Sequence, residues 1–291
     1  MVWSLAAGVP GSRLLEASPQ KREAAAEFTF VQISDSHIGF NKPANPDVAG
    51  TLTAAVEQIN KLDRQPDLII HTGDLSHLAK AAEFDTMEQI LRGLKQKQVF
   101  YVPGEHDFTG DQGKQYLARF GKMAKGSGWQ SFNHKGVHFV GLNNVEQLEG
   151  LGKIGREQLD WLKKDLSGVT ASTPVVVFAH IPLWSVYPQW GWGTQDGEDA
   201  LGLLKRFGSV TVLNGHIHQV LQKVEGQVAF HTAASTAFPQ PAPGSAPAAG
   251  PMMVPAEKLR SVLGIRDVTF VPGRERLAVV DAPLAGKQGA E

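Results

Sequence analysis

Six apolar runs, each closed by a polar or glycine-containing break, constrain the fold of this chain more than any other feature. The runs begin at residues 28, 67, 99, 137, 175 and 210 and read "FTFVQIS", "DLIIHTG", "VFYVPG", "VHFVGLN", "VVVFAH" and "VTVLNGH". Continuous Val, Ile, Leu and Phe runs of this length predict strands that are covered on both faces. A sheet made of such strands needs other elements on both sides.

Helical periods lie between these runs. The first apolar stripe consists of Val48, Leu52, Ala55, Val56, Ile59 and Leu62, and the second of Phe84, Met87, Leu91 and Leu94. Two shorter helices are predicted over residues 158–166 and 199–207. Strands that alternate with helices indicate an α/β sheet, whose ligands are expected at the carboxyl ends of the strands.

Chemically active side chains follow five of the six runs. In chain order they are Asp35-Ser36-His37, Gly73-Asp74, Gly104-Glu105-His106-Asp107, His180 and Gly215-His216-Ile217-His218. Each has an ordinary structural explanation when taken alone, and Asp35 is also well placed to cap a helix. Together the five strand ends supply enough Asp and His for two metal ions, with one carboxylate to bridge them.

Composition narrows the chemistry. The chain has no cysteine, which excludes disulfides, thiolate catalysis and cysteine-type zinc sites, so a metal must sit on His, Asp, Glu or Asn. With 28 basic and 29 acidic residues, the charge is nearly balanced, and no broad footprint for nucleic acid or anionic lipid stands out. The expected partner is a small molecule.

Both ends of the chain differ in composition from its middle. Residues 1–27 have the short apolar core and small-residue end of a secretory signal but lack its basic start, so they are either a plain leader or a signal-peptide remnant. The remnant would imply an exported or periplasmic protein, and the plain leader a cytoplasmic one. No apolar run reaches membrane-spanning length. Residues 28–291 are expected to form one domain, with a Pro/Ala/Gly-rich loop at 238–256.

The five motifs, in this order and at strand ends, resemble the calcineurin-like metallophosphoesterase superfamily. The short blocks look most like its bacterial cyclic-nucleotide-phosphodiesterase branch, and the resemblance covers about residues 28–235. It departs at Glu105, because the family usually places Asn there. The resemblance implies an α/β fold, a four-layer α/β/β/α sandwich of two mixed sheets.

The resemblance also implies two transition-metal ions, which would be manganese, iron or zinc. Matching residues place Asp35, His37, Asp74 and His218 on the first ion, and Asp74, Glu105, His180 and His216 on the second. A hydroxide between the ions would attack phosphorus, as in other two-metal hydrolases. His106 would assist the leaving group and Asp107 would orient its imidazole. The implied activity is hydrolysis of phosphate diesters or monoesters.

The substrate is less clearly indicated. Trp184, Tyr187, Trp190 and Trp192 crowd the loop after His180. These aromatic side chains either contact the substrate, which could then be nucleotide-like, or cover the sheet. His77, on the loop after Asp74, could also reach the site. Two other functions stay open, a non-catalytic binding module on the same fold and a nuclease, although the balanced charge disfavours the nuclease.

Overall fold

The computed structural model describes residues 25–274 and 276–284, with the side chain of Met123 left aside, and the backbone of residues 2–6 and 9–13. In the latter, β1 (Val2–Ala6) pairs with β2 (Val9–Arg13) in antiparallel fashion. Most of the predicted leader at 1–27 lies outside the described residues. Its interpretation as a signal remnant, and the cellular location that this would imply, stay predictions.

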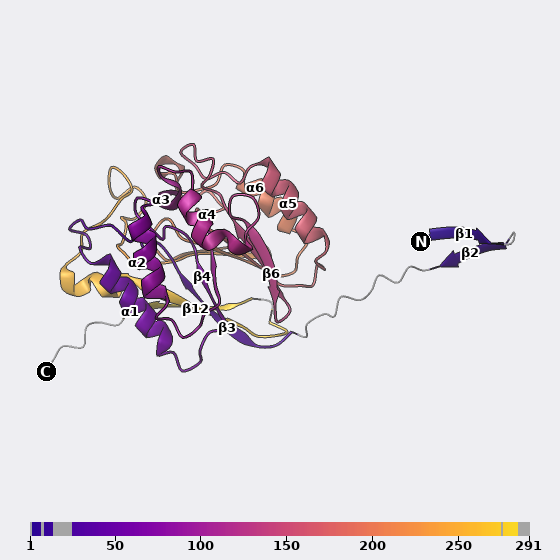
Figure 1. Cartoon of the computed structure of the whole chain (residues 1–291), viewed down its shortest axis with the longest axis horizontal. Helices are drawn as coiled ribbons and strands as arrows, with labels where there is room; N and C mark the ends of the chain where they lie inside the picture. Colours follow the sequence, from indigo (N-terminus) through magenta and orange to yellow (C-terminus); the bar gives the residue numbers. More distant parts are fainter. Residues whose placement is uncertain (1, 7–8, 14–24, 275, 285–291) are drawn as a thin grey trace.

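Two mixed sheets form the body of the molecule (Figure 1). The five-stranded sheet has the order β13-β12-β3-β4-β5 and the six-stranded sheet the order β10-β11-β9-β8-β7-β6. The first comprises β3 (Phe28–Ile33), β4 (Leu68–His71), β5 (Val99–Tyr101), β12 (Gly264–Phe270) and β13 (Ala278–Pro283). The second comprises β6 (Gln130–His134), β7 (Val137–Leu142), β8 (Val175–Ala179), β9 (Val210–Asn214), β10 (Leu221–Glu225) and β11 (Val228–Thr232).

Each sheet contains a run of parallel strands, which is flanked by antiparallel strands on both sides in the six-stranded sheet and on the β12–β13 side alone in the five-stranded sheet. The strands β3, β4 and β5 run parallel, as do β7, β8, β9 and β11, whereas β6, β10, β12 and β13 are antiparallel to their neighbours. All six apolar runs are strands, namely β3, β4, β5, β7, β8 and β9. Their division between two mixed sheets confirms the expected sandwich.

Helices cover the outer faces of both sheets. The predicted apolar stripes lie on α1 (Val48–Asn60) and α2 (Ala81–Leu91), which pack on the five-stranded sheet, while α5 (Arg156–Ser167) and α6 (Gly197–Leu204) pack on the other. The shorter helices are α3 (Glu105–Phe108), α4 (Lys114–Phe120) and α7 (Leu259–Val262), with single turns at η1 (Gly121–Met123), η2 (Pro188–Trp190) and η3 (Ala256–Lys258). None of the described helices has the length and apolarity needed to cross a membrane.

The strand β3 shows why the predicted strands are mainly apolar. Phe28 and Phe30 enter the core between the sheets, whereas Val31 and Ile33 enter the core beneath α1 and α2. Successive side chains of a strand point to opposite faces, so a strand with a core on each side cannot alternate with polar residues. The ring of Phe30 meets that of Phe139 on β7 edge-on at 5.5 Å, which ties the sheets together. Each fully buried Phe contributes about 1.5–3 kcal/mol.

The carboxyl ends of the parallel strands in both sheets meet at one edge of the sandwich. The backbone there is cross-linked, because the amide of Asp35 donates to the carbonyl of Gly73 and the amide of Gly215 donates to the carbonyl of His180. Residues 238–255, predicted to be a loop, follow this edge as turns without a helix or strand.

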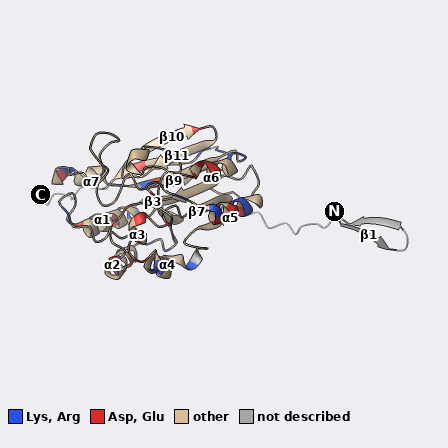
Figure 2. Cartoon of the chain, turned by 90° about the horizontal axis from the view of Figure 1, so that it is seen from above, with Lys and Arg blue, Asp and Glu red and all other residues tan. Residues whose placement is uncertain are grey.

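Figure 2 shows acidic and basic residues interspersed over the described elements.

Candidate metal centre

Seven residues predicted as metal ligands meet at this edge. They follow five strands, β3, β4, β5, β8 and β9, and comprise Asp35, His37, Asp74, Glu105, His180, His216 and His218. Their ligand atoms form groups of three in which all atoms lie within 4.8 Å of one another. The cluster involves both sheets. Its first four residues follow strands of the five-stranded sheet, and its last three, all histidines, follow strands of the six-stranded sheet.

One set of donors gathers around His37. Its Nε2 lies 3.2 Å from Nε2 of His218 and 3.4 Å from Oδ2 of Asp74. Nε2 of His218 in turn lies 3.2 Å from Oδ1 of Asp35. All four residues are buried, so these close contacts occur away from bulk water.

The second set gathers around Glu105. Its Oε2 lies 2.9 Å from Nε2 of His180, and its Oε1 lies 3.0 Å from Nδ1 of His216. His180 connects this set to the first, because its Nε2 is 3.4 Å from Oδ2 of Asp74. That Asp74 oxygen is therefore equally close to a histidine of each set.

These distances fit metal coordination. Two ligands that each lie about 2.1 Å from an ion are roughly 3–3.5 Å apart at tetrahedral or octahedral angles. Several of the atoms also lack hydrogen-bond partners within the described chain although they are buried, namely Glu105 Oε2, His180 Nε2 and both ring nitrogens of His216. Buried polar atoms that are close together but not aligned for hydrogen bonds call for an ion as their partner. The residues present thus fit two ions.

Backbone carbonyls orient two of the histidines. Nδ1 of His180 lies 2.7 Å from the carbonyl oxygen of Thr72, and Nδ1 of His218 lies 2.6 Å from that of Phe238. A ring that donates through Nδ1 keeps Nε2 as an acceptor, and in both rings Nε2 faces the cluster. These hydrogen bonds therefore favour, in His180 and His218, the tautomer that suits metal binding through Nε2.

The backbone of the site is held in an uncommon conformation. Asp35, His37, Asp74, His216 and His218 have φ angles between 42° and 71°. They are five of the eight described non-glycine residues with positive φ. This left-handed region costs L-residues energy and persists where the surrounding structure imposes it, often at functional sites.

Two glycines of the motifs allow the close approach of these segments. A Cβ on Gly104 would lie 2.0 Å from Oδ1 of Asp74, and one on Gly215 would lie 2.1 Å from Oγ of Ser34. Both distances are far below van der Waals contact. Any side chain at either position would push the metal-binding segments apart.

The carboxylates and imidazoles shift each other's protonation. Burial raises the pKa of Glu105, but attraction to His216 and His180 outweighs burial and lowers it well below its usual value. Burial lowers the pKa of His180, and the carboxylates of Asp74 and Glu105 raise it well above its usual value. Charge pairing thus favours ionised carboxylates here, which is the form that binds metal.

His106 lines the pocket at the centre of the cluster, which has a volume of about 160 Å³. Its Nδ1 lies 2.7 Å from the carbonyl oxygen of His77, and its ring stacks on the His77 ring at 4.7 Å. Burial lowers the pKa of His106, but the carboxylates of Asp74 and Glu105 outweigh burial and raise it. The ring is thus held by a backbone carbonyl and a neighbouring imidazole.

The expected contact between Asp107 and the His106 ring is corrected by the structure. The buried Asp107 carboxylate accepts hydrogen bonds from the amides of Gly104, Leu75 and Ser76 and from the Ser76 hydroxyl. Asp107 is the third residue of α3, so its side chain turns back to the start of the helix, while the His106 ring leaves in another direction. Asp107 therefore holds the loops after β4 and β5 together.

Two further residues lie at the site, of which the sequence analysis mentioned His77 only briefly and did not predict Phe238. His77 lies with its Nδ1 3.3 Å from Nδ1 of His37, and the ring of Phe238 packs against both His37 and His218 at 4.8 and 4.7 Å. The position of His77 three residues after Asp74 was a usable signal. Phe238 begins the proline-rich loop, where only its aromatic character sets it apart.

The aromatic loop after β8 behaves mainly as cover for the sheet. Trp192 is 1 % exposed and Trp184 is 8 % exposed, with its ring packed against Phe230 of β11. Trp190 packs edge-on against Tyr187 and Trp192. The described lining of the metal pocket includes none of these residues, which favours the second of the two alternatives, that the aromatic side chains cover the sheet.

Comparison with known proteins agrees with this geometry. Residues 28–220 match the family model described as calcineurin-like phosphoesterase. The chain is 24% identical over 217 residues to a 3′,5′-cyclic-nucleotide phosphodiesterase of Nostoc sp. strain PCC 7120, covering 72% of this chain and 79% of that protein. It is 28% identical over 232 residues to a serine/threonine-protein phosphatase of Danio rerio, covering 69% and 73%.

A solved structure supports the same fold. A dimetal phosphatase from Danio rerio superposes with a TM-score of 0.64 at 17% identity, covering 89% of this chain and 99% of that one. The chain belongs to the calcineurin-like phosphoesterase family. It is a hydrolase of phosphoric esters.

Proposed function

We propose that this protein hydrolyses small phosphate esters, diesters in particular, with two transition-metal ions. The first ion is assigned to Asp35, His37, Asp74 and His218, and the second to Asp74, Glu105, His180 and His216. The observation that carries the proposal is the position of Asp74 Oδ2, at 3.4 Å from a histidine nitrogen of each set. A shared carboxylate is the simplest way to hold two ions about 3.5–4 Å apart.

When bound, the two ions supply the Lewis acidity and positive charge that in-line attack of water on phosphorus requires. The chain's own residues then position the ester. The metal pocket suits a phosphate group in size, and Lys42 lines it as a side chain of positive charge. His106 donates from Nδ1 to the His77 carbonyl, and its raised pKa favours the imidazolium form, whose Nε2–H can give a proton to the leaving oxygen.

Small esters are favoured over polymers. The chain carries nearly equal numbers of acidic and basic residues, and in Figure 2 both kinds lie along the same helix α5. Relatives named as cyclic-nucleotide phosphodiesterases, from Nostoc and from Mycobacterium tuberculosis, support a nucleotide-like ester as one candidate. The relative named as a protein phosphatase keeps monoesters open.

Hydrolysis of bis(4-nitrophenyl) phosphate tests this function. The purified chain is stripped of metal with a chelator and then given manganese, iron or zinc, and turnover and bound metal are both measured. We expect negligible turnover after stripping and recovery as bound metal approaches about two ions per chain. A chain that binds two ions but hydrolyses neither diesters nor monoesters would instead be a binding module.

A further inference from the structure

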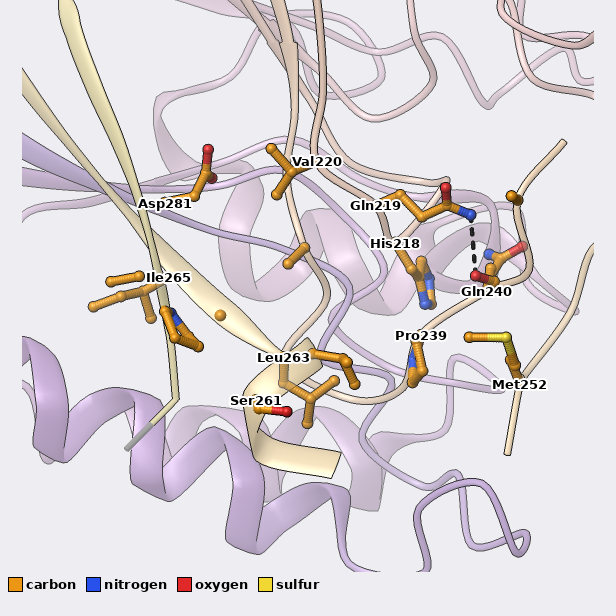
Figure 3. Close-up of a pocket in the computed structure, with 16 residues that line it drawn as sticks. His218, Gln219, Val220, Pro239, Gln240, Met252, Ser261, Leu263, Ile265 and Asp281 are labelled. Carbon is orange, nitrogen blue, oxygen red and sulfur yellow. Dashed lines mark hydrogen bonds between the residues drawn. The ribbon is translucent and has the colours of Figure 1, made fainter. Parts of the chain in front are cut away.

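A second hollow adjoins the metal pocket on the other side of the loop at 238–256. It has a volume of about 500 Å³ and is shown in Figure 3. Ten of its sixteen lining residues have apolar side chains, among them Met252, Leu263 and Ile265. The carboxylate in its wall, Asp281, is already paired with Arg266, whose Nη2 lies 2.7 Å from Oδ1. This hollow, called the apolar cavity below, therefore suits an uncharged, apolar guest.

The apolar cavity and the metal pocket share a wall. His218 and Gln240 line both hollows, and along the loop Pro251 lines the metal pocket while the next residue, Met252, lines the apolar cavity. Figure 3 shows His218, Gln240 and Met252 together on one side of the apolar cavity. A molecule bound at the metal ions thus has the apolar cavity as its neighbour across Gln240.

The rim of the apolar cavity exposes large apolar side chains. Val220 is 42 % exposed, Val262 38 % and Met252 36 %. They come from three segments, namely the stretch after β9, helix α7 and the proline-rich loop. Contact with an apolar guest would remove their surfaces from water, which favours binding.

We propose that the apolar cavity receives the apolar arm of the phosphate ester whose phosphate group occupies the metal pocket. The proposal rests on the proposed function and narrows its substrate to esters with an alkyl or aryl arm. A volume of this size is typical of small-molecule sites, and its concave shape does not suit a protein surface. A nucleobase fits less well, because ten of the sixteen lining side chains are apolar and Asp281 is already paired with Arg266, so only part of its polar edge would find partners, such as Gln240 or Ser261.

A series of diesters with one constant leaving group tests the proposal. The probes are methyl, butyl and octyl 4-nitrophenyl phosphate, used below the concentrations at which they aggregate, and 4-nitrophenyl thymidine 5′-phosphate as the nucleoside arm. We expect kcat/KM to rise by at least about tenfold from the methyl to the octyl ester, since each buried methylene adds to binding. The gain should appear mainly in KM, and the thymidine ester should do no better than the methyl ester.

Two variants that fill the apolar cavity locate the effect. Val262→Trp and Ala242→Trp place bulk at exposed positions of its lining, and each should bring the octyl-to-methyl ratio of kcat/KM close to one. Val224→Trp is the matched control, because Val224 is 53 % exposed on β10 and does not line the apolar cavity. It should keep the wild-type ratio.

The outcomes separate the proposals. A wild-type ratio near one, or a ratio that survives both cavity-filling variants, overturns the apolar-arm subsite while metal-dependent hydrolysis stands. A preference for the thymidine ester over the octyl ester overturns it in favour of a nucleoside arm. Absence of metal-dependent hydrolysis of every diester in the series, and of monoesters, overturns the proposed function itself, and the subsite with it.

Discussion

At the scale of single residues, the imidazole of His106 is held through one ring nitrogen and lies beside the proposed metal ligands, with a ring nitrogen within 4.8 Å of Asp74 and Glu105. Its Nδ1 is committed to the His77 carbonyl at 2.7 Å, and the ring lines the metal pocket. His106 is not among the residues assigned to either proposed ion, so its removal should spare metal binding. Its chemistry is therefore separable from that of the neighbouring Glu105.

We expect His106→Ala to bind about two metals like the wild type while turnover falls by roughly 10²–10⁴-fold, the usual effect of losing a general acid. The loss should be smallest for 4-nitrophenyl esters, whose leaving group needs little protonation, and largest for alkyl monoesters. Steady-state kinetics on both ester types measures this. His134→Ala, a change at the end of β6 outside the cluster, serves as the control. Equal losses on both ester types would contradict the acid role.

Glu105 is the residue at which the sequence is expected to depart from the family pattern, and its carboxylate points into the cluster, 2.9 Å from His180 and 3.0 Å from His216. With Asp35 and Asp74 it gives the site three carboxylates, so the second ion sees more negative charge than an Asn would provide. We expect Glu105→Asn to weaken binding of the second ion, to leave the first intact and to change which metal gives the best activity. Metal titration monitored by calorimetry measures both affinities.

Glu105→Asp is the matched control, because it keeps the charge and shortens the reach by one methylene. It should retain more of the second site's affinity than the Asn variant does. If Glu105→Asn keeps both affinities and the same metal preference, then Glu105 is not a ligand.

At the scale of elements, each donor lies just beyond the end of a strand. The apolar runs predicted these strands because a strand with a core on both faces is mainly apolar, and the polar breaks then marked the donors. Side-chain direction was not predictable in the same way. Asp107 is next to His106 in sequence, yet it turns toward backbone amides, because the short helix α3 sends neighbouring side chains in different directions.

The proline-rich loop is the element whose contribution was least predictable. Its composition predicts only an irregular path, but its first residue, Phe238, packs against His37 and His218 and accepts from the His218 ring through its carbonyl. No periodicity marks such a contact, since it depends on how the loop returns from β11 to the metal edge.

We expect Phe238→Ala to lower the affinity of the first metal site by about 10–100-fold, as is usual when support behind a ligand is lost. The melting temperature should fall as well, because a buried ring is removed. Phe230→Ala is the control, since Phe230 is 2 % exposed and lies in the core beneath α6, away from the ligands. It should lower the melting temperature alone, and identical metal affinities in both variants would contradict the supporting role of Phe238.

At the scale of the whole molecule, the site exists because two sheets present their strand ends at one edge. The sequence predicts the strands but not their assignment to sheets, which arises from long-range pairings such as that of β12, near the C-terminus, with β3. The division of the strands into two mixed sheets was predicted only from the resemblance to the metallophosphoesterase family. The position of Asp74, whose Oδ2 lies 3.4 Å from both His37 of one sheet and His180 of the other, follows only once both sheets are in place.

The metal content of Asp74→Ala tests the bridged two-metal site most directly. Elemental analysis of wild-type protein, Asp74→Ala and the control Asp165→Ala, which removes a carboxylate paired with His138 outside the cluster, should be made on folded, identically loaded samples. We expect about two ions per chain in the wild type and in Asp165→Ala, and one or none in Asp74→Ala, because the carboxylate shared by both ions is lost. Two ions per chain in Asp74→Ala would contradict the bridge and with it the proposed centre.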